Sequence, residues 1–365
     1  MDNEGVIGKE IHMENVVGKQ KHIFIEVLRI VACFFAMVNH STFLYSYTNI
    51  NMYAYTVPPR SWYISLIYYF LSKIAVPIFI MISGYTMLDR QDDYKKSAQR
   101  IGRVVLVLLV FSSIYYVNQW LNGTRVTIGI FDYLKSLYKS PQAWSHWYLY
   151  MYLGLLIMMP FLQKMVANMK KLDCQIFIGI SLVSQAILPI IEHHWPDYTS
   201  SKLIDLSLFT SYICMMFIGH YMKKYVTPSK KKFVFSVVLH ISTIVFGVVM
   251  TCYEFYNNSG MNYFFYENRV VFNIILQSAS FFYMMMHIKW NKKWEKGIKL
   301  VGGCTFGMYL LNDFFIEKLA FIYQDLCAAG LHYTVSEVIW QVAIFMTSFM
   351  VTLILKRIPF IKKLI

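Results

Sequence analysis

This 365-residue sequence has few charged residues: Asp, Glu, Lys and Arg together make up 15% of it. Soluble globular proteins carry about 25% charged residues, whereas hydrophobic residues reach 57% of this chain. This balance excludes a secreted disulfide scaffold, a disordered regulator and a soluble enzyme with a membrane tail. Ten membrane-spanning helices of about 20 residues each would use roughly 200 residues. The composition therefore predicts an all-α, polytopic transmembrane helix bundle with short loops.

Several common signals are also missing. The six cysteines form no CxxC pair and no metal-ligand spacing, which predicts free cysteines at apolar sites. His193 and His194 lie side by side in a predicted outer loop with no third ligand nearby in the sequence, so we predict no metal site. The first twenty residues show no signal peptide of the usual order. No internal repeat, low-complexity tract or long linker divides the chain.

Apolar runs set the predicted organisation of the chain. Ten predicted membrane spans cover residues 23–45, 61–88, 101–121, 146–166, 174–191, 204–222, 233–253, 270–288, 300–321 and 335–356. A cytoplasmic tail at 1–22 precedes a membrane domain at 23–356, and a second cytoplasmic tail follows at 357–365. Pro77 predicts a kink in the second span, and Lys73, one turn earlier, would then face a polar interior.

The positive charge of the chain is unevenly distributed among the predicted loops. The formal net charge is +14, which by itself could suggest a nucleic-acid partner. However, 24 Lys and Arg residues lie in the two tails and the even-numbered loops, against 6 in the alternate loops. Positive residues accumulate on the cytoplasmic side of membrane proteins. The asymmetry predicts both termini in the cytoplasm and an even number of spans, and it argues against nucleic-acid binding.

The first span contains four polar or ionisable residues, namely Glu26, Arg29, Asn39 and His40. Such groups are costly in a bilayer, usually face the interior of a bundle, and are functional candidates there. Arg29 and His40 are eleven residues apart, which is about 20° from a whole number of turns and roughly 16 Å of rise. They therefore share one helix face, with Arg29 near the cytoplasm and His40 near the outside.

Two interpretations of this face remain open at the level of sequence. In the structural one, Arg29 pairs with Glu26 and extends to the inner interface, while His40 bonds a neighbouring helix. In the functional one, His40 takes and gives protons, as histidine does near neutral pH. Small residues between Arg29 and His40 leave room for a partner helix or for an extended ligand.

Further motifs follow in a fixed order along the chain. They are Glu26-x-x-Arg29-x-x-Ala32 followed by His40, the run 76–85 that ends in Ser83-Gly84-Tyr85, Arg100-Ile-Gly-Arg103, His146-Trp147-Tyr148-Leu149 with Tyr152 and Pro160, Phe217-Ile-Gly219, and Thr305-Phe306-Gly307-Met308-Tyr309-Leu310-Leu311-Asn312. Together they resemble the acyltransferase-3 family of integral membrane acyltransferases. Thr305 stands where the family pattern has Ser, and Asn312 stands where it has His.

The resemblance implies transfer of an acyl group, commonly acetyl, from cytoplasmic acyl-CoA to a hydroxyl of an extracytoplasmic glycan or lipid-linked sugar. CoA is polyanionic, so its phosphates need Arg or Lys. The predicted site has His40 as general base, with Arg29 and His146 as further catalytic residues, Arg29, Arg100, Arg103 and Ser83 at acetyl-CoA, and Trp147, Asn312 and Tyr309 at the acceptor. No metal is expected.

Two other functions compete with this hypothesis. A polysaccharide or small-molecule exporter would need no acyl-CoA, and a structural or sensory membrane protein would tolerate loss of His40. The Lys- and Ile-rich composition is typical of a bacterium with an AT-rich genome, and the predicted location is the plasma membrane. Some members of the resembled family carry an extra soluble esterase-like domain. We expect none here, so that any relay is intramembrane or uses a separate protein.

Overall fold

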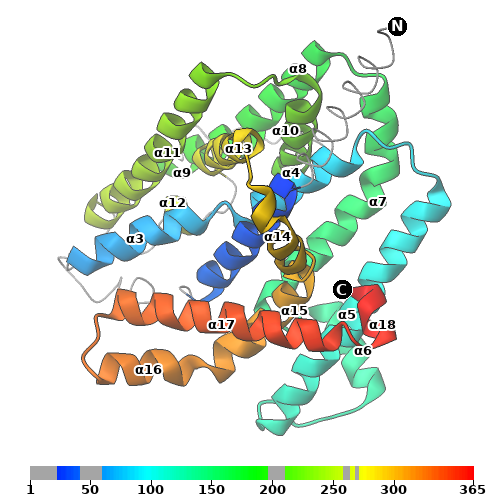
Figure 1. Ribbon diagram of the computed structural model, residues 1–365, viewed down its shortest axis with the longest axis vertical. Helices are drawn as coiled ribbons and strands as arrows, with labels where there is room; N and C mark the ends of the chain where they lie inside the picture. The colour runs from blue at the N-terminus through cyan, green and yellow to red at the C-terminus, as the bar shows by residue number, and fades with distance from the viewer. Residues whose placement is uncertain (1–22, 42–59, 196–209, 258–263, 268–270) are drawn as a thin grey trace, which may run out of the picture.

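Figure 1 shows a computed structural model of the chain, which describes residues 23–41, 60–195, 210–257, 264–267 and 271–365. Every regular element in these residues is helical. The predicted all-α bundle is therefore confirmed, while the predicted tail at 1–22 lies outside the described residues.

Seven helices in the described part of the chain are long and apolar enough to cross a bilayer. They are the N-terminal helix Ile23–Ser41, α3 (Arg60–Ser72) with α4 (Ala75–Met87), α5 (Tyr94–Leu121), η1 (Trp144–His146) with α7 (Trp147–Ala167), α8 (Lys171–Leu182) with η2 (Val183–Ile187) and α9 (Leu188–His194), α11 (Lys230–Asn257) and α17 (Tyr333–Leu355). They correspond to seven of the ten predicted spans.

The other three predicted spans correspond to shorter helices. These are α10 (Ser211–Tyr225), α13 (Phe272–His287) and α15 (Thr305–Lys318), with 15, 16 and 14 residues. At 1.5 Å per residue they extend about 21–24 Å, less than the roughly 30 Å hydrocarbon core of a bilayer. Most of their side chains are buried, so other helices rather than lipid surround them. The remaining elements are α6 (Ile130–Lys139), α12 (Phe264–Glu267), η4 (Lys292–Trp294), α14 (Glu295–Gly302), α16 (Ala320–Ala328) and α18 (Pro359–Leu364).

The second predicted span is interrupted between α3 and α4, at Lys73 and Ile74. Pro77 lies in the first turn of α4 and has no backbone N–H, so the Lys73 carbonyl loses its usual helical donor. The side chain of Asn39 donates to the Ser72 carbonyl oxygen at 2.7 Å and thereby satisfies one of the carbonyls that the break releases. The interruption confirms the kink that Pro77 predicts.

A close crossing joins α4 to α10. A Cβ atom added to Gly84 would overlap the backbone of Met216, and one added to Gly219 would overlap the backbone of Met81. Glycine at both positions lets the two backbones touch, as small residues do at helix interfaces in membranes. Two sequence motifs that are far apart, Ser83-Gly84 and Phe217-Ile-Gly219, thus meet in one contact.

The N-terminal helix, dark blue and unlabelled in Figure 1, lies in the middle of the bundle. Leu28, Cys33 and Met37 on this helix are fully buried. Arg29 lies near its beginning and His40 near its end. We call the corresponding sides of the bundle the Arg29 end and the His40 end.

Candidate active site

Arg29 and His40 each line a different cavity. His40 lines a cavity of about 60 Å³ at the His40 end, and its side chain is only 8% exposed. Arg29 lines a cavity of about 510 Å³ at the Arg29 end, and its side chain is 38% exposed. The helix face that Arg29 and His40 are predicted to share therefore borders two separate cavities.

Three aromatic side chains separate the cavities, because Phe79, Tyr148 and Tyr309 line both of them. The ring centroid of Tyr148 lies 6.1 Å from that of Phe79 and 5.8 Å from that of Tyr309. They come from α4, α7 and α15, and we call them the aromatic partition. The Tyr309 hydroxyl donates to the Ser145 carbonyl oxygen, which fixes one side of the partition to η1.

The cavity at the Arg29 end is strongly cationic. Arg29, Arg90, Arg100 and Arg103 all line it, together with the hydroxyl-bearing Ser83. None of the described residues that line it is acidic. Guanidinium groups bind phosphates and carboxylates through paired hydrogen bonds. The four residues predicted from sequence to contact acetyl-CoA thus lie around one cationic cavity.

Each of three arginines also has a partner within the protein. Arg29 pairs with Glu26 at 2.7 Å, as the structural interpretation expects. Arg103 donates from Nε and one Nη to the Leu364 carbonyl oxygen, at 3.0 and 2.9 Å. A guanidinium group has five N–H donors, so these contacts orient the side chains and leave donors for a ligand.

The third pair, Arg100 with Asp92, joins atoms 2.5 Å apart. Asp92 lies in the loop between α4 and α5, where Gln163 also donates to its carboxylate at 3.1 Å. The pKa of the Asp92 carboxyl is held below its usual value, chiefly by the hydrogen bond from Arg100. The hydrogen bond from Gln163 lowers this pKa further, whereas burial acts in the opposite direction. Asp92 therefore remains ionised and keeps Arg100 at the cavity.

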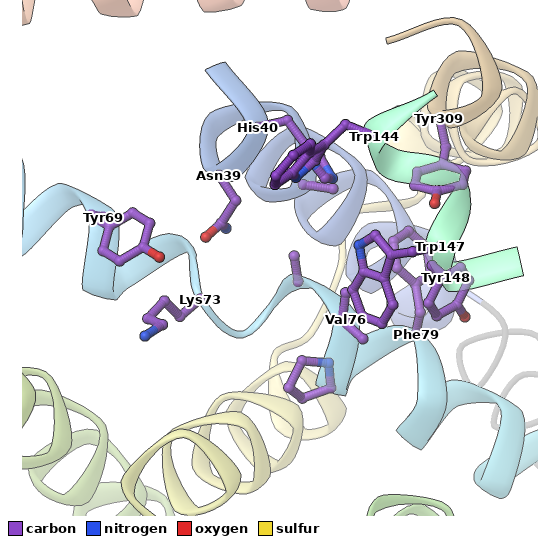
Figure 2. Close-up of a pocket in the computed structure, with 13 residues that line it drawn as sticks. Asn39, His40, Tyr69, Lys73, Val76, Phe79, Trp144, Trp147, Tyr148 and Tyr309 are labelled. Carbon is purple, nitrogen blue, oxygen red and sulfur yellow. The ribbon is translucent and has the colours of Figure 1, made fainter. Parts of the chain in front are cut away.

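The cavity at the His40 end lies beside the break between α3 and α4. Figure 2 shows Asn39, Lys73, Val76 and Trp147 around this space. The Lys73 Nζ donates to the carbonyl oxygens of Phe265 and Tyr266 at 2.8 and 2.6 Å. Its buried charge thus faces a polar interior, as the sequence predicts.

His146 lies close to this cavity but does not line it. Its side chain is fully buried, with Nδ1 3.1 Å from the Ser112 hydroxyl and Nε2 3.4 Å from the Leu310 carbonyl oxygen. The arrangement fits a neutral ring in which Nε2 donates and Nδ1 accepts. His146 is near enough to His40 and Asp313 to interact with both electrostatically. The ring of His146 therefore lies outside the cavity, held between α5 and α15.

The three residues predicted at the acceptor divide between two environments. Trp147 lines the cavity at the His40 end, and Tyr309 belongs to the aromatic partition. Asn312 lines neither cavity. It is completely buried, and its amide makes no hydrogen bond to any residue that the structure describes.

The chain matches the acyltransferase-3 domain, which is described as an acyltransferase domain, over residues 22–357. The chain belongs to the acyltransferase-3 family. It is a membrane acyltransferase, and the family resemblance of its motifs is confirmed. No match was found among curated proteins or among solved structures.

Within this acyltransferase-3 protein, several site residues carry weak signals in the sequence. Phe79 lies within the apolar run 76–85 and Tyr148 within the motif that begins at His146, but neither is distinguished as a site residue, because the chain holds 28 Phe and 28 Tyr. Arg90 counts only as one more positive loop residue. Asn39 is a candidate from the sequence as a polar residue directly before His40 in an apolar helix, but the sequence assigns it no specific role. Its role at the α3–α4 break depends on a contact 33 residues away.

Proposed function

We propose that this protein is an O-acyltransferase that moves an acyl group, acetyl in the simplest case, from acyl-CoA to a hydroxyl of an extracytoplasmic glycan. The donor binds at the Arg29 end, which the Lys and Arg distribution assigns to the cytoplasm. The acceptor hydroxyl reaches the His40 end. The observation that carries the proposal is the pair of cavities on one helix, cationic at one end and holding a buried histidine at the other.

The size and charge of the larger cavity suit the donor. Its volume of about 510 Å³ lies within the roughly 300–1,000 Å³ typical of small-molecule sites. Arg29, Arg100 and Arg103 would bind the phosphates of CoA, with the hydroxyl of Ser83 beside them. The pantetheine arm is long and flexible and carries the thioester at its far end, so the reactive carbonyl would reach the aromatic partition.

The smaller cavity, at the His40 end, suits the acyl-transfer step. His40 accepts the proton of the acceptor hydroxyl as its oxygen attacks the thioester carbonyl. The new ester C–O bond forms, the C–S bond breaks, and the CoA thiolate leaves. The proton held on His40 then returns to the thiolate or to solvent. His146 and Asn39 would position His40 and the α3–α4 break around the reacting atoms.

The volume of about 60 Å³ limits what the second cavity holds. This volume is well below the roughly 300–1,000 Å³ typical of small-molecule sites, so we expect the cavity to hold the reacting groups rather than a whole sugar unit. The aromatic partition would have to open for donor and acceptor to meet.

The test is transfer of labelled acetyl from acetyl-CoA to glycan in membranes that contain the wild type, His40→Ala or Arg29→Ala at equal protein levels. His332→Ala serves as the matched control, since His332 lies at the start of α17 and lines neither cavity. We expect label in glycan with the wild type and with His332→Ala. Because a positioned general base contributes about 10²–10⁴-fold, the signal should fall by that factor in His40→Ala.

Two results would contradict the proposal. Equal transfer by the wild type and His40→Ala would remove the histidine from the mechanism. Failure of the wild type with acetyl-CoA and with longer acyl-CoA donors, together with glycan retained inside cells that lack the protein, would favour an exporter.

A further inference from the structure

A second cluster of side chains, outside both cavities, has the composition of a metal site. His193 and His194 end α9, and Glu254 lies on α11 about sixty residues later in the chain. One donor atom from each of the three lies within 4.8 Å of the others. The sequence offers no third ligand beside the two histidines, whereas the fold brings Glu254 to them.

The geometry is already close to that of a coordination sphere. His194 Nε2 lies 3.6 Å from Glu254 Oε1. Zinc–nitrogen and zinc–oxygen bonds of about 2.0–2.2 Å in a tetrahedron place neighbouring donor atoms roughly 3.4 Å apart. Adjacent residues of a helix normally point away from each other, yet the rings of His193 and His194 lie only 4.9 Å apart. The three donor atoms therefore lie near enough to one another to share one ion.

The surroundings also favour a bound cation. Glu254 is fully buried and lies beside His194. Both ring nitrogens of His194 are buried without a hydrogen-bond partner among the described residues. Phe264 packs against His193 and Phe265 against His194, forming the apolar shell that is common around metal ligands.

We propose that His193, His194 and Glu254 bind a divalent transition-metal ion, with Zn²⁺ as the ion of best fit. Two imidazoles and one carboxylate are a donor set that zinc accepts, with a fourth position for water. The ion clamps the end of α9 to α11. The clamp also bears on the smaller cavity, because Phe265 donates its N–H to Glu254 at 3.4 Å and accepts from Lys73 through its carbonyl. This site is independent of the acyl-transfer proposal.

The test is Zn²⁺ binding by the purified full chain in detergent after removal of metals with a chelator. The wild type should bind one Zn²⁺ per chain, and Co²⁺ in its place should give the visible absorption of a tetrahedral site. His194→Ala and Glu254→Gln should each weaken Zn²⁺ binding by more than the roughly 10–100-fold that loss of an outer-shell partner costs. His194→Cys should retain binding, because a thiolate replaces the lost imidazole.

Two controls separate a site from general binding by surface groups. Glu192→Gln removes an acid next to the cluster, and His332→Ala removes a histidine elsewhere, and both should bind Zn²⁺ like the wild type. Zn²⁺ should also raise the Tm of the wild type and of the controls but not of His194→Ala. Zn²⁺ binding that is no tighter in the wild type than in His194→Ala would overturn the proposal. Equal weakening by Glu192→Gln and Glu254→Gln would overturn it as well.

Discussion

The two cavities differ in size and in lining. The cavity at the Arg29 end has a volume of about 510 Å³ and is lined by four arginines. The cavity at the His40 end has a volume of about 60 Å³, and His40 and Lys73 line it among mainly aromatic and aliphatic residues. One helix contributes to both. A large charged space suits the binding of an anionic group, and a small, mainly apolar one strengthens electrostatic effects on a reacting atom. In the function proposed above, donor binding and chemistry are separated along the N-terminal helix, and this separation can be tested.

The largest effect should follow from His40→Ala. We expect kcat to fall about 10²–10⁴-fold through loss of the general base, while the Kd of acetyl-CoA stays near that of the wild type because His40 does not line the larger cavity. Kd measured by calorimetry on purified protein, alongside turnover, provides the comparison. A large change in Kd with kcat preserved would show that the two cavities do not divide the work in this way.

Arg103→Ala should change the Kd of acetyl-CoA rather than kcat, the opposite of His40→Ala. Hydrogen bonds to charged groups contribute about 1.5–3 kcal/mol, so we expect the Kd of acetyl-CoA to rise by about 10–150-fold with little change in kcat at saturating donor. Arg125→Ala is the matched control, because Arg125 pairs with Asp132 and lines neither cavity. Equal loss of affinity in both variants would mean that general surface charge, rather than the cavity, attracts the donor.

A substitution in the aromatic partition, between the two cavities, should have a smaller effect on stability and on transfer. Tyr309→Phe leaves the buried Ser145 carbonyl without the donor that the hydroxyl provides, which costs about 1–3 kcal/mol. Thermal unfolding should therefore occur at lower temperature, and transfer should slow through disorder of the partition. Tyr152→Phe is the control, since the hydroxyl of Tyr152 contacts only the Met87 sulfur, at 3.9 Å, among the hydrogen bonds of the described residues. Identical melting of both variants would contradict a role for the Tyr309 hydroxyl.

The smallest effect concerns Asp92, which holds Arg100 at the larger cavity. Its pKa is lowered in the folded state, chiefly by the hydrogen bond from Arg100. Its contribution to stability is therefore complete above the unfolded-state pKa of about 4 and is lost as the pH falls through the lowered folded-state value. The Tm difference between the wild type and Asp92→Asn should be present at pH 7 and should disappear at more acidic pH. A difference that grows on acidification would contradict this assignment.

Much of the fold follows from the hydrophobic pattern. Apolar runs identify the long helices because a span in lipid must be apolar over about 20 residues. The pattern does not distinguish a lipid-facing helix from a buried one, so it gives no sign that α10, α13 and α15 are too short to reach across a bilayer alone. The apolar run 300–321 is also divided, because α14 ends at Gly302 and α15 begins at Thr305.

The site residues that lie on a single helix were predictable from the sequence. Arg29 and His40 follow from helical periodicity alone, and Arg100 with Arg103 follows from the motif of the acyltransferase-3 family. Contacts between distant segments were not predictable. The aromatic partition joins three helices, and Glu254 meets His193 only through the packing of α9, α11 and α12. Periodicity describes one helix at a time, and such contacts depend on how helices pack.

The aromatic partition has an electrical consequence. Phe79, Tyr148 and Tyr309 line both cavities, one at each end of the bundle. If water fills both cavities, we expect most of the membrane voltage to fall across these three rings. A full elementary charge that crosses a membrane gains or loses about 2.3 kcal/mol per 100 mV, and most of that would be felt within these three rings. A neutral thioester carbonyl passes such a layer without this electrical work, whereas a phosphate does not.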